Sequence, residues 1–161
     1  MHTPTRKLRI VTIGAGISAF NLAYKLQHEH KNLSSAAILS HTIYEANPSI
    51  GGTWLVNTYP GVACDVPAHI YTFPFEPNPD WSAYYAGGEE ILAYLRRTVA
   101  KYGLDRDVKC GHRVEKATFD EGRGKWVLRV RRGDEVIEDE CDVLISATGF
   151  LSQWRWPGIE G

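Results

Sequence analysis

The sequence predicts an α/β fold in which a parallel sheet with flanking helices is joined to a small antiparallel β-meander. Three observations predict it. The apolar run "LRIVTI" leads into "GAG" and then into apolar residues at helical spacing, as expected for a buried strand and the helix after it. A second strand-like run, "AAILSHTIYEA", follows that helix. Later strand-like pieces alternate with polar turns such as "EGRGK" and "RGDE", which is typical of antiparallel pairing.

The first half of the chain is interpreted as a β-α-β unit and a second helix. The apolar pattern predicts a strand over 8–13, a helix over 17–30 and a second strand that ends at Glu45. Such a crossover is almost always right-handed and joins parallel strands. The next apolar stripe at helical spacing predicts a helix over 89–102, which Gly103 should end.

The remaining segments complete one domain, because 161 residues suit a single core. Residues 46–86 are rich in proline, glycine and aromatic residues, and are predicted to be an irregular loop. Residues 108–141 are predicted to form the β-meander, and 142–149 a returning buried strand. The last residues, 150–161, are turn-like.

Composition excludes several classes of function. The formal net charge of −1 gives no electrostatic reason to expect nucleic acid or an anionic membrane as a partner. No apolar run approaches the roughly 20 residues of a membrane span, and no signal-peptide pattern opens the chain, so we expect a cytoplasmic protein. The three cysteines are odd in number and widely spaced, and the six histidines do not cluster. Neither a disulfide framework nor a metal site is expected. Composition does not indicate an oligomeric state.

A glycine motif between the first strand and the first helix carries the strongest functional signal. Gly14, Gly16 and Ala19 form GxGxxA, the fingerprint of a Rossmann-type dinucleotide-binding domain. The first glycine permits a tight turn, the second lets a pyrophosphate approach the backbone, and the small third residue lets helix and strand pack closely. The helix N-terminus would then favour the phosphates. The alternative is a glycine turn without a ligand.

Glu45, at the end of the second strand, is expected to accept hydrogen bonds from ribose hydroxyls. A carboxylate there would repel a 2′-phosphate, so the site suits FAD or NAD rather than NADP. The antiparallel meander and the final strand ending in "ATG" favour FAD, because a dehydrogenase would continue with further β-α-β units. The alternative for Glu45 is a solvated strand end.

Four segments together resemble the N-terminal FAD domain of Baeyer–Villiger monooxygenases, within the wider class of flavin-containing monooxygenases. They are "GAGISA", "YEAN", "GGTWLVNTYPGVACD" and "ISATGFLS", and the resemblance covers nearly the whole chain. The third segment is the most specific, because it fits the family pattern [A/G]GxWxxxxYPGxxxD. The matching residues are Gly51 or Gly52, Trp54, Tyr59, Pro60, Gly61 and Asp65.

The resemblance implies a set of cofactor-binding residues. They are Gly14, Gly16, Ser18, Glu45, Gly52, Thr53, Trp54, Cys64, Asp65, Tyr71, Val114, Ala147, Thr148 and Gly149. Trp54 would pack beside the isoalloxazine ring, and the Val114 backbone would meet the adenine edge. Asp65, the one catalytic residue implied, would help to place the nicotinamide and nearby cationic groups. The alternatives are a capping carboxylate for Asp65 and a hydrophobic plug for Trp54.

The chemistry that the resemblance implies is oxygenation. NADPH would reduce FAD, O2 would react with the reduced flavin, and a ketone would be converted to an ester or lactone. The flavin carries this chemistry, while the protein supplies position, electrostatics and exclusion of water. Two alternatives remain open: an N- or S-oxygenating flavin monooxygenase, and a non-catalytic FAD-binding remnant.

Several features of the family are expected beyond "PGIEG". These are the signature FxGxxxHxxx[W/F]P, a second GxGxxG for NADPH and the arginine that assists oxygenation. Residues 150–161 are therefore expected to be a truncated linker towards an absent NADPH domain. Phe150, Trp154 and Trp156 should form exposed apolar surface, unless they fold back onto the meander. We expect the chain alone to hold FAD weakly and not to oxygenate ketones.

Overall fold

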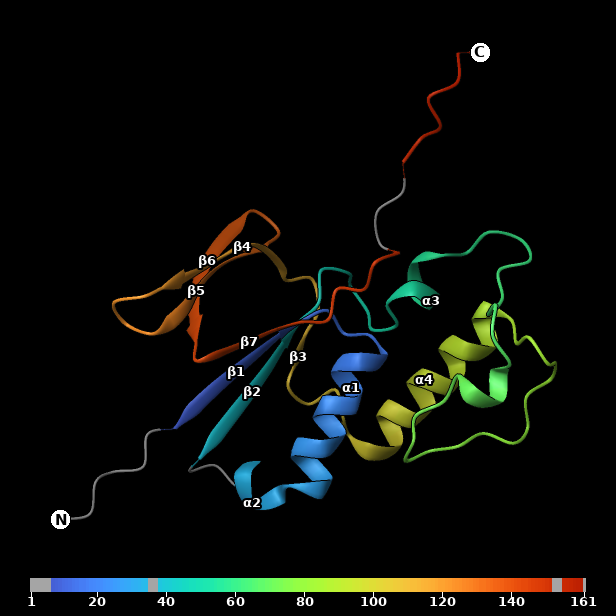
Figure 1. The fold of residues 1–161 in the computed structure, drawn as a ribbon, viewed down its shortest axis with the longest axis horizontal. Coiled ribbons are helices and arrows are strands. Elements are labelled where there is room, and N and C mark those ends of the chain that lie inside the picture. The colour runs from blue at the N-terminus through green and yellow to red at the C-terminus, as the bar shows by residue number, and fades with distance from the viewer. Residues whose placement is uncertain (1–6, 35–37, 152–154, 161) are drawn as a thin grey trace.

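The computed structural model describes residues 7–34, 38–151 and 155–160, and within them a parallel sheet forms the centre of the fold (Figure 1). Its strands are β1 (Leu8–Ile13), β2 (Leu39–Tyr44), β3 (Val108–Lys109) and β7 (Val143–Ser146). Their spatial order is β3-β2-β1-β7, and every neighbouring pair is parallel. The predicted α/β class, with a β-α-β unit built from β1 and β2, is confirmed.

The helices largely follow the predicted pattern. They are α1 (Ile17–Tyr24), the π-helical turn η1 (Lys25–Glu29), α2 (Lys31–Ser34), α3 (Thr53–Val56), the 3₁₀ turn η2 (Ala68–Ile70) and α4 (Gly88–Tyr102). The predicted helix 17–30 is therefore α-helical only in its first part. In η1 the wider turn buries Leu26 and Gln27 next to each other. Gly103 ends α4 in the left-handed conformation, with φ of 62°, as predicted.

Two hydrophobic clusters lie on opposite faces of the parallel sheet. Ile43 on β2 belongs to the larger cluster, which α1, α4 and the loop between β2 and α4 complete. Its neighbour Tyr44 points the other way, into a smaller cluster with Leu128 and Val130 of the meander. Figure 1 shows the helices and the meander on different sides of β1, β2 and β7. The parallel sheet is thus covered on both faces, as its apolar strands predicted.

The antiparallel meander is shorter than predicted. It consists of β4 (Arg113–Asp120), β5 (Lys125–Arg132) and β6 (Glu135–Cys141), in the order β4-β5-β6. The predicted start at residue 108 is wrong, because β3 at 108–109 pairs in parallel with β2. The Ile43 N–H donates to Asp107 O, and the Glu45 N–H donates to Lys109 O. Gly111, with φ of 69°, then turns the chain out of the parallel sheet.

Polar contacts attach the meander to the parallel sheet. The Arg9 side chain on β1 donates to Glu140 O at 2.9 Å and pairs with the Asp139 carboxylate on β6. The Tyr44 hydroxyl on β2 donates to the same carboxylate at 2.7 Å. Burial and this hydrogen bond raise the pKa of Tyr44 to about 12. These contacts fix the orientation of β6, and therefore of β7, which follows it directly.

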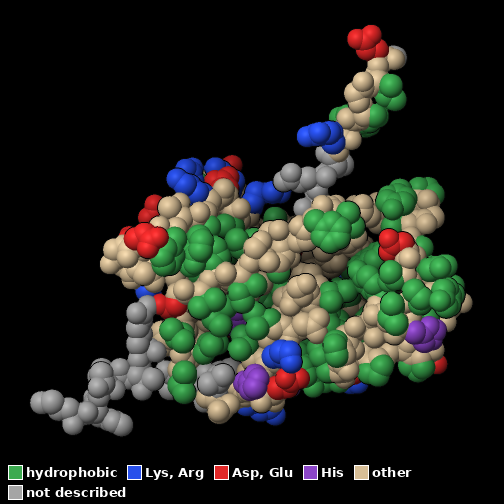
Figure 2. Space-filling model, in the orientation of Figure 1, with side chains coloured by type: hydrophobic (Ala, Val, Ile, Leu, Met, Phe, Trp, Pro, Cys, Tyr) green, Lys and Arg blue, Asp and Glu red, His purple; other side chains and the backbone are tan. Residues whose placement is uncertain are grey.

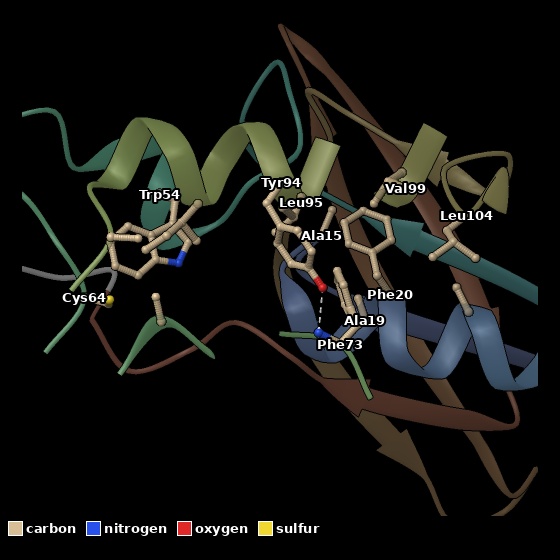
Figure 3. Close-up of a cluster of buried hydrophobic side chains, with 14 of the residues drawn as sticks. Ala15, Ala19, Phe20, Trp54, Cys64, Phe73, Tyr94, Leu95, Val99 and Leu104 are labelled. Atoms are coloured by element: carbon tan, nitrogen blue, oxygen red, sulfur yellow. Dashed lines mark hydrogen bonds between the residues drawn. The ribbon is translucent and has the colours of Figure 1, made fainter. Parts of the chain in front are cut away.

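The segment 46–86 is mostly irregular, as predicted, but it is firmly attached to α4. The Tyr94 hydroxyl accepts a hydrogen bond from Phe73 N at 2.8 Å, which Figure 3 shows, and donates to Glu76 O at 2.5 Å. The Glu76 carboxylate accepts hydrogen bonds from Lys101 at 2.8 Å and from Tyr102 at 2.7 Å.

No helix in the described ranges is long and apolar enough to cross a membrane.

Residues 155–160 lie away from the body of the protein (Figures 1 and 2). Phe150 is 92% exposed and Trp156 is 76% exposed. The prediction that these side chains form exposed apolar surface is confirmed for them. Trp154 lies outside the described residues.

His41 on β2 makes the stability of the fold depend on pH. Its Nε2 lies 2.8 Å from the Thr12 hydroxyl, and its Nδ1 is buried without a hydrogen bond in the described structure. Burial lowers the pKa of His41 from 6.5 to about 4, with an opposing effect from Asp107 and a further lowering by Arg106. The unfolded chain therefore binds a proton near pH 6 that the folded chain does not. The free energy of unfolding therefore decreases as pH falls from about 6.5, the ordinary pKa of histidine, to about 4, the pKa of His41 in the folded chain.

We expect the free energy of unfolding to fall by about 1 kcal/mol between pH 7 and pH 5.5 on account of this group. Urea denaturation at the two pH values measures the change. The variant His41→Gln should show a flatter dependence. The variant His30→Gln, which changes an exposed histidine, should retain the wild-type slope. Equal slopes for the wild type and His41→Gln would contradict the assignment.

Candidate functional site

A glycine turn at the carboxyl end of β1 is shaped by close contacts on both sides. Gly14 has φ of 98°, and its N–H donates to Tyr44 O at 2.7 Å. A Cβ at Gly14 would lie 2.6 Å from the carbonyl oxygen of Ala147, the residue that follows β7. The first glycine therefore permits both a left-handed turn and the close approach of the 147–149 segment.

Gly16 occupies a different environment, because it faces open space. It is the N-cap of α1 in an extended conformation, with φ of −99°, and a Cβ placed there would meet no heavy atom of the described residues within 4 Å. No side chain in the described part of the chain caps this end of α1, and the first turn contains no acidic residue. Ser18 in that turn is exposed. The amides at this helix end are thus available to an anionic ligand.

Glu45 lies directly after β2 and is buried, with 5% of its surface exposed. Its Oε2 accepts a hydrogen bond from Ala15 N at 2.8 Å, inside the glycine turn. Its Oε1 accepts from Asn47 N at 2.8 Å and from Asn47 Nδ2 at 2.7 Å. The carboxylate is therefore not a solvated strand end. It connects the end of β2 to the glycine turn after β1.

The segment "GGTW" lies against the same turn. Gly51 N–H donates to Ala15 O at 3.3 Å. Gly52 has φ of 55°, and a Cβ there would lie 3.5 Å from Gly16 Cα. Thr53, the first residue of α3, follows immediately. The two glycine-containing segments, far apart in the sequence, therefore meet at one place.

Trp54 is largely buried, at 8% exposed, and packs in the larger hydrophobic cluster with Cys64 (Figure 3). Its indole N–H donates to the Tyr71 hydroxyl at 2.9 Å, and the two rings meet edge-on at 5.4 Å. Burial raises the pKa of Tyr71, an effect that the Trp54 hydrogen bond opposes and the charges of Cys64 and Asp65 reinforce. In this structure Trp54 acts as a core residue that also fixes Tyr71.

Asp65 is exposed, next to buried Cys64. Within the ranges that the structure describes, its carboxylate makes no hydrogen bond or ion pair. No capping interaction therefore accounts for it there. The Asp65 charge contributes to the raised pKa of the Tyr71 hydroxyl, so the two groups interact electrostatically.

The remaining predicted residues lie in two places, directly after β7 and at the start of β4. Ala147 N–H donates to Ile13 O at 2.9 Å and so continues the parallel ladder, while Thr148 and Gly149 are exposed. Val114 pairs with Val130 inside the meander and packs in the smaller cluster. Val114 is connected to the site through His112, two residues before it, whose N–H donates to Glu45 O at 2.8 Å.

The structure thus brings three predicted groups to the carboxyl ends of β1, β2 and β7: the glycine turn, Glu45 with "GG", and the turn after β7. The side chains of Trp54 and Tyr71 lie in the adjoining loop. Asn47 was not predicted, because an asparagine two residues after a strand is ordinary in a turn. Only the three-dimensional contact with Glu45 identifies it.

Comparison with known proteins agrees with this arrangement. Residues 12–87 match a family described as NAD(P)-binding Rossmann-like domain. A protein named FAD-binding monooxygenase tazF, from Aspergillus terreus, is 53% identical over 97% of this chain and 27% of its own length. A Baeyer-Villiger monooxygenase from Streptomyces coelicolor is 36% identical over 96% of this chain and 28% of its own length.

Solved structures share the fold. The crystal structure of OTEMO in complex with FAD and NADP matches with a TM-score of 0.79 and 29% identity, over 98% of this chain and 28% of that one. An S-allyl-L-cysteine S-oxygenase from Allium sativum matches with a TM-score of 0.76 at 24% identity, over 99% of this chain and 40% of that one, which shows the fold alone. The chain is therefore similar in sequence to part of proteins named FAD-binding and Baeyer-Villiger monooxygenases, and spans about a quarter of the length of these curated relatives.

Proposed function

We propose that this chain is the FAD-binding part of an NADPH- and O2-dependent flavin monooxygenase of the Baeyer–Villiger type. The observation that carries the proposal is the meeting of the glycine turn, Glu45 and the "GG" pair at the carboxyl ends of β1 and β2. Ligands of doubly wound α/β folds bind at such strand ends. The names of the relatives, which specify FAD-binding and Baeyer–Villiger monooxygenases, support the same conclusion.

The residues present fit the FAD pyrophosphate. The empty space beside Gly16 and the uncapped N-terminus of α1 leave room and hydrogen-bond donors for phosphate oxygens. Ser18 is exposed in the same turn, and Gly52 borders Gly16 from the other side. The single domain 1–161 would hold the cofactor across this turn, with the adenosine ribose at Glu45 and the adenine near Val114.

The flavin end would lie over the loop that carries Trp54, Cys64, Asp65 and Tyr71. Bound FAD supplies the redox chemistry, with electrons from NADPH and oxygen from O2. Trp54 and Cys64, which are buried, would exclude water from that side of the ring. Thr53 would line it, and the exposed Asp65 carboxylate would orient cationic groups and the nicotinamide by charge-assisted hydrogen bonds. The segment 147–149 would close the site after β7.

The substrate class in this proposal is a ketone, converted to an ester or lactone. The loop "GGTWLVNTYPGVACD" supports it, through its resemblance to the Baeyer–Villiger pattern. The relatives are more than three times as long as this chain, so residues that shape a ketone site and bind most of NADPH would lie outside it. The alternatives are N- or S-oxygenation and a chain that binds FAD without catalysis.

Product analysis tests the reaction type. The purified chain, supplied with FAD, NADPH and a panel of ketones, tertiary amines and thioethers, is expected to give no product above the flavin-only control. The longest expressed protein that carries this sequence should give an ester or lactone from a ketone. N-oxide or sulfoxide as the main product would favour the first alternative. Fast ketone turnover by the chain alone would contradict the need for residues outside it.

A further inference from the structure

We propose that Asn47 is a positioning residue for the ribose end of the dinucleotide site, acting by holding the Glu45 carboxylate in place. The proposal rests on the proposed function for the identity of the ligand. Its structural part, the control of Glu45 by Asn47, stands on contacts within the chain.

Asn47 supplies two of the three hydrogen bonds that the Glu45 carboxylate accepts from described residues. Its backbone N–H and its side-chain amide both donate to Oε1, at 2.8 and 2.7 Å. Ala15 N–H donates to Oε2 at 2.8 Å. With a donor on each oxygen, the plane of the carboxylate is fixed against rotation. Removal of the Asn47 side chain would leave Oε1 with a single donor, the backbone N–H of residue 47, while Ala15 N–H still donates to Oε2.

Asn47 is itself held from the far side of the site. Gly111 N–H donates to Asn47 O at 2.8 Å, and His112 N–H donates to Glu45 O at 2.8 Å. These residues lead from β3 into β4. The turn 45–47 is therefore fixed between the glycine turn and the entrance to the meander, so Asn47 couples Glu45 to both.

The hydrogen-bond capacity of Glu45 limits what it can offer a ligand. A carboxylate has about four acceptor positions. Ala15 and Asn47 together occupy three of them. Among the contacts of the described residues one position is left, which suits a single ribose hydroxyl. Asn47 thus determines both the orientation of Glu45 and the number of hydroxyls it can bind.

The test compares Asn47→Ala with Asn78→Ala. Asn78 is a matched control, because its side chain also closes a local turn, accepting from Asp80 N at 3.4 Å in an exposed hydrogen bond that does not involve Glu45. Two quantities are measured: the dissociation constant of FAD, and the hydrogen-exchange rate of the Ala15 amide. Asn47→Ala should weaken FAD binding about tenfold and speed exchange at Ala15 by a similar factor, since a hydrogen bond to a charged group is lost. Asn78→Ala should change neither.

The outcomes separate this proposal from the proposed function. Unchanged FAD binding and unchanged Ala15 exchange in Asn47→Ala would overturn the role of Asn47 while FAD binding by the wild type stands. If Asn47→Ala speeds Ala15 exchange but the wild-type chain binds no FAD, the control of Glu45 by Asn47 is supported and the proposed ligand, FAD, is contradicted. Faster exchange at every amide would show a general loss of stability and contradict a positioning role. If Asn47→Ala does not fold, Asn47→Ser should show the same two local effects.

Discussion

Replacing Gly14 with alanine is expected to destabilise the folded chain by about 3 kcal/mol or more. Two costs add at this position. A non-glycine residue at a φ of 98° is strained, typically by 1–3 kcal/mol. The new Cβ would also lie 2.6 Å from the carbonyl oxygen of Ala147, so the segment after β7 would have to move. A loss of this size lowers the melting temperature by roughly 10 °C in a chain of this length.

Gly133→Ala separates the two costs. Gly133, in the turn between β5 and β6, has φ of 58°, but a Cβ there would meet nothing within 4 Å. The control variant should therefore lose only the conformational part, about 1 kcal/mol. Thermal denaturation followed by circular dichroism measures both. Equal losses in Gly14→Ala and Gly133→Ala would contradict the contact between the glycine turn and Ala147.

Replacing Gly16 with alanine should have the opposite profile: little change in stability and a large loss of FAD affinity. The backbone at Gly16 is extended and the space beside it is empty, so alanine fits the chain without its ligand. A methyl group there would occupy the space where a pyrophosphate must approach the backbone. We expect FAD affinity to fall by about 100-fold, which corresponds to roughly 2.7 kcal/mol.

Gly87→Ala is the matched control for Gly16→Ala. Gly87 is also an N-cap glycine without a side-chain cap, with φ of −68°, but it begins α4. Calorimetric titration with FAD should give the wild-type affinity for this variant. If Gly16→Ala binds FAD as tightly as the wild type does, the phosphate does not lie at the N-terminus of α1.

The sequence predicted the features that local geometry determines. Gly14 and Gly16 could be assigned because a strand, a glycine turn and a helix follow one another without interruption. Gly103 could be assigned as a helix end because the apolar stripe stops there. At Gly14 and Gly103 the residue type meets a steric requirement of the adjacent backbone, because both have a positive φ. Gly16 was assigned from its place in the motif.

Features that depend on distant segments were not predictable in the same way. Val108 and Lys109 continue an apparent strand into the meander, and only their pairing with β2 separates them from it. The π-helical turn after Tyr24 follows no local signal. The hydrogen bond of Trp54 to Tyr71 and that of Asn47 to Glu45 depend on how loops fold back, which a hydrophobic pattern does not encode.

The central claim is that this chain itself forms a dinucleotide site at the glycine turn after β1. Calorimetric titration of the purified wild-type chain with FAD, repeated in the presence of ADP, tests it most directly. The account predicts saturable one-to-one binding of FAD that ADP weakens by competition, since both ligands carry the adenosine ribose and pyrophosphate. Absence of binding up to millimolar FAD, or binding that ADP leaves unchanged, would contradict it.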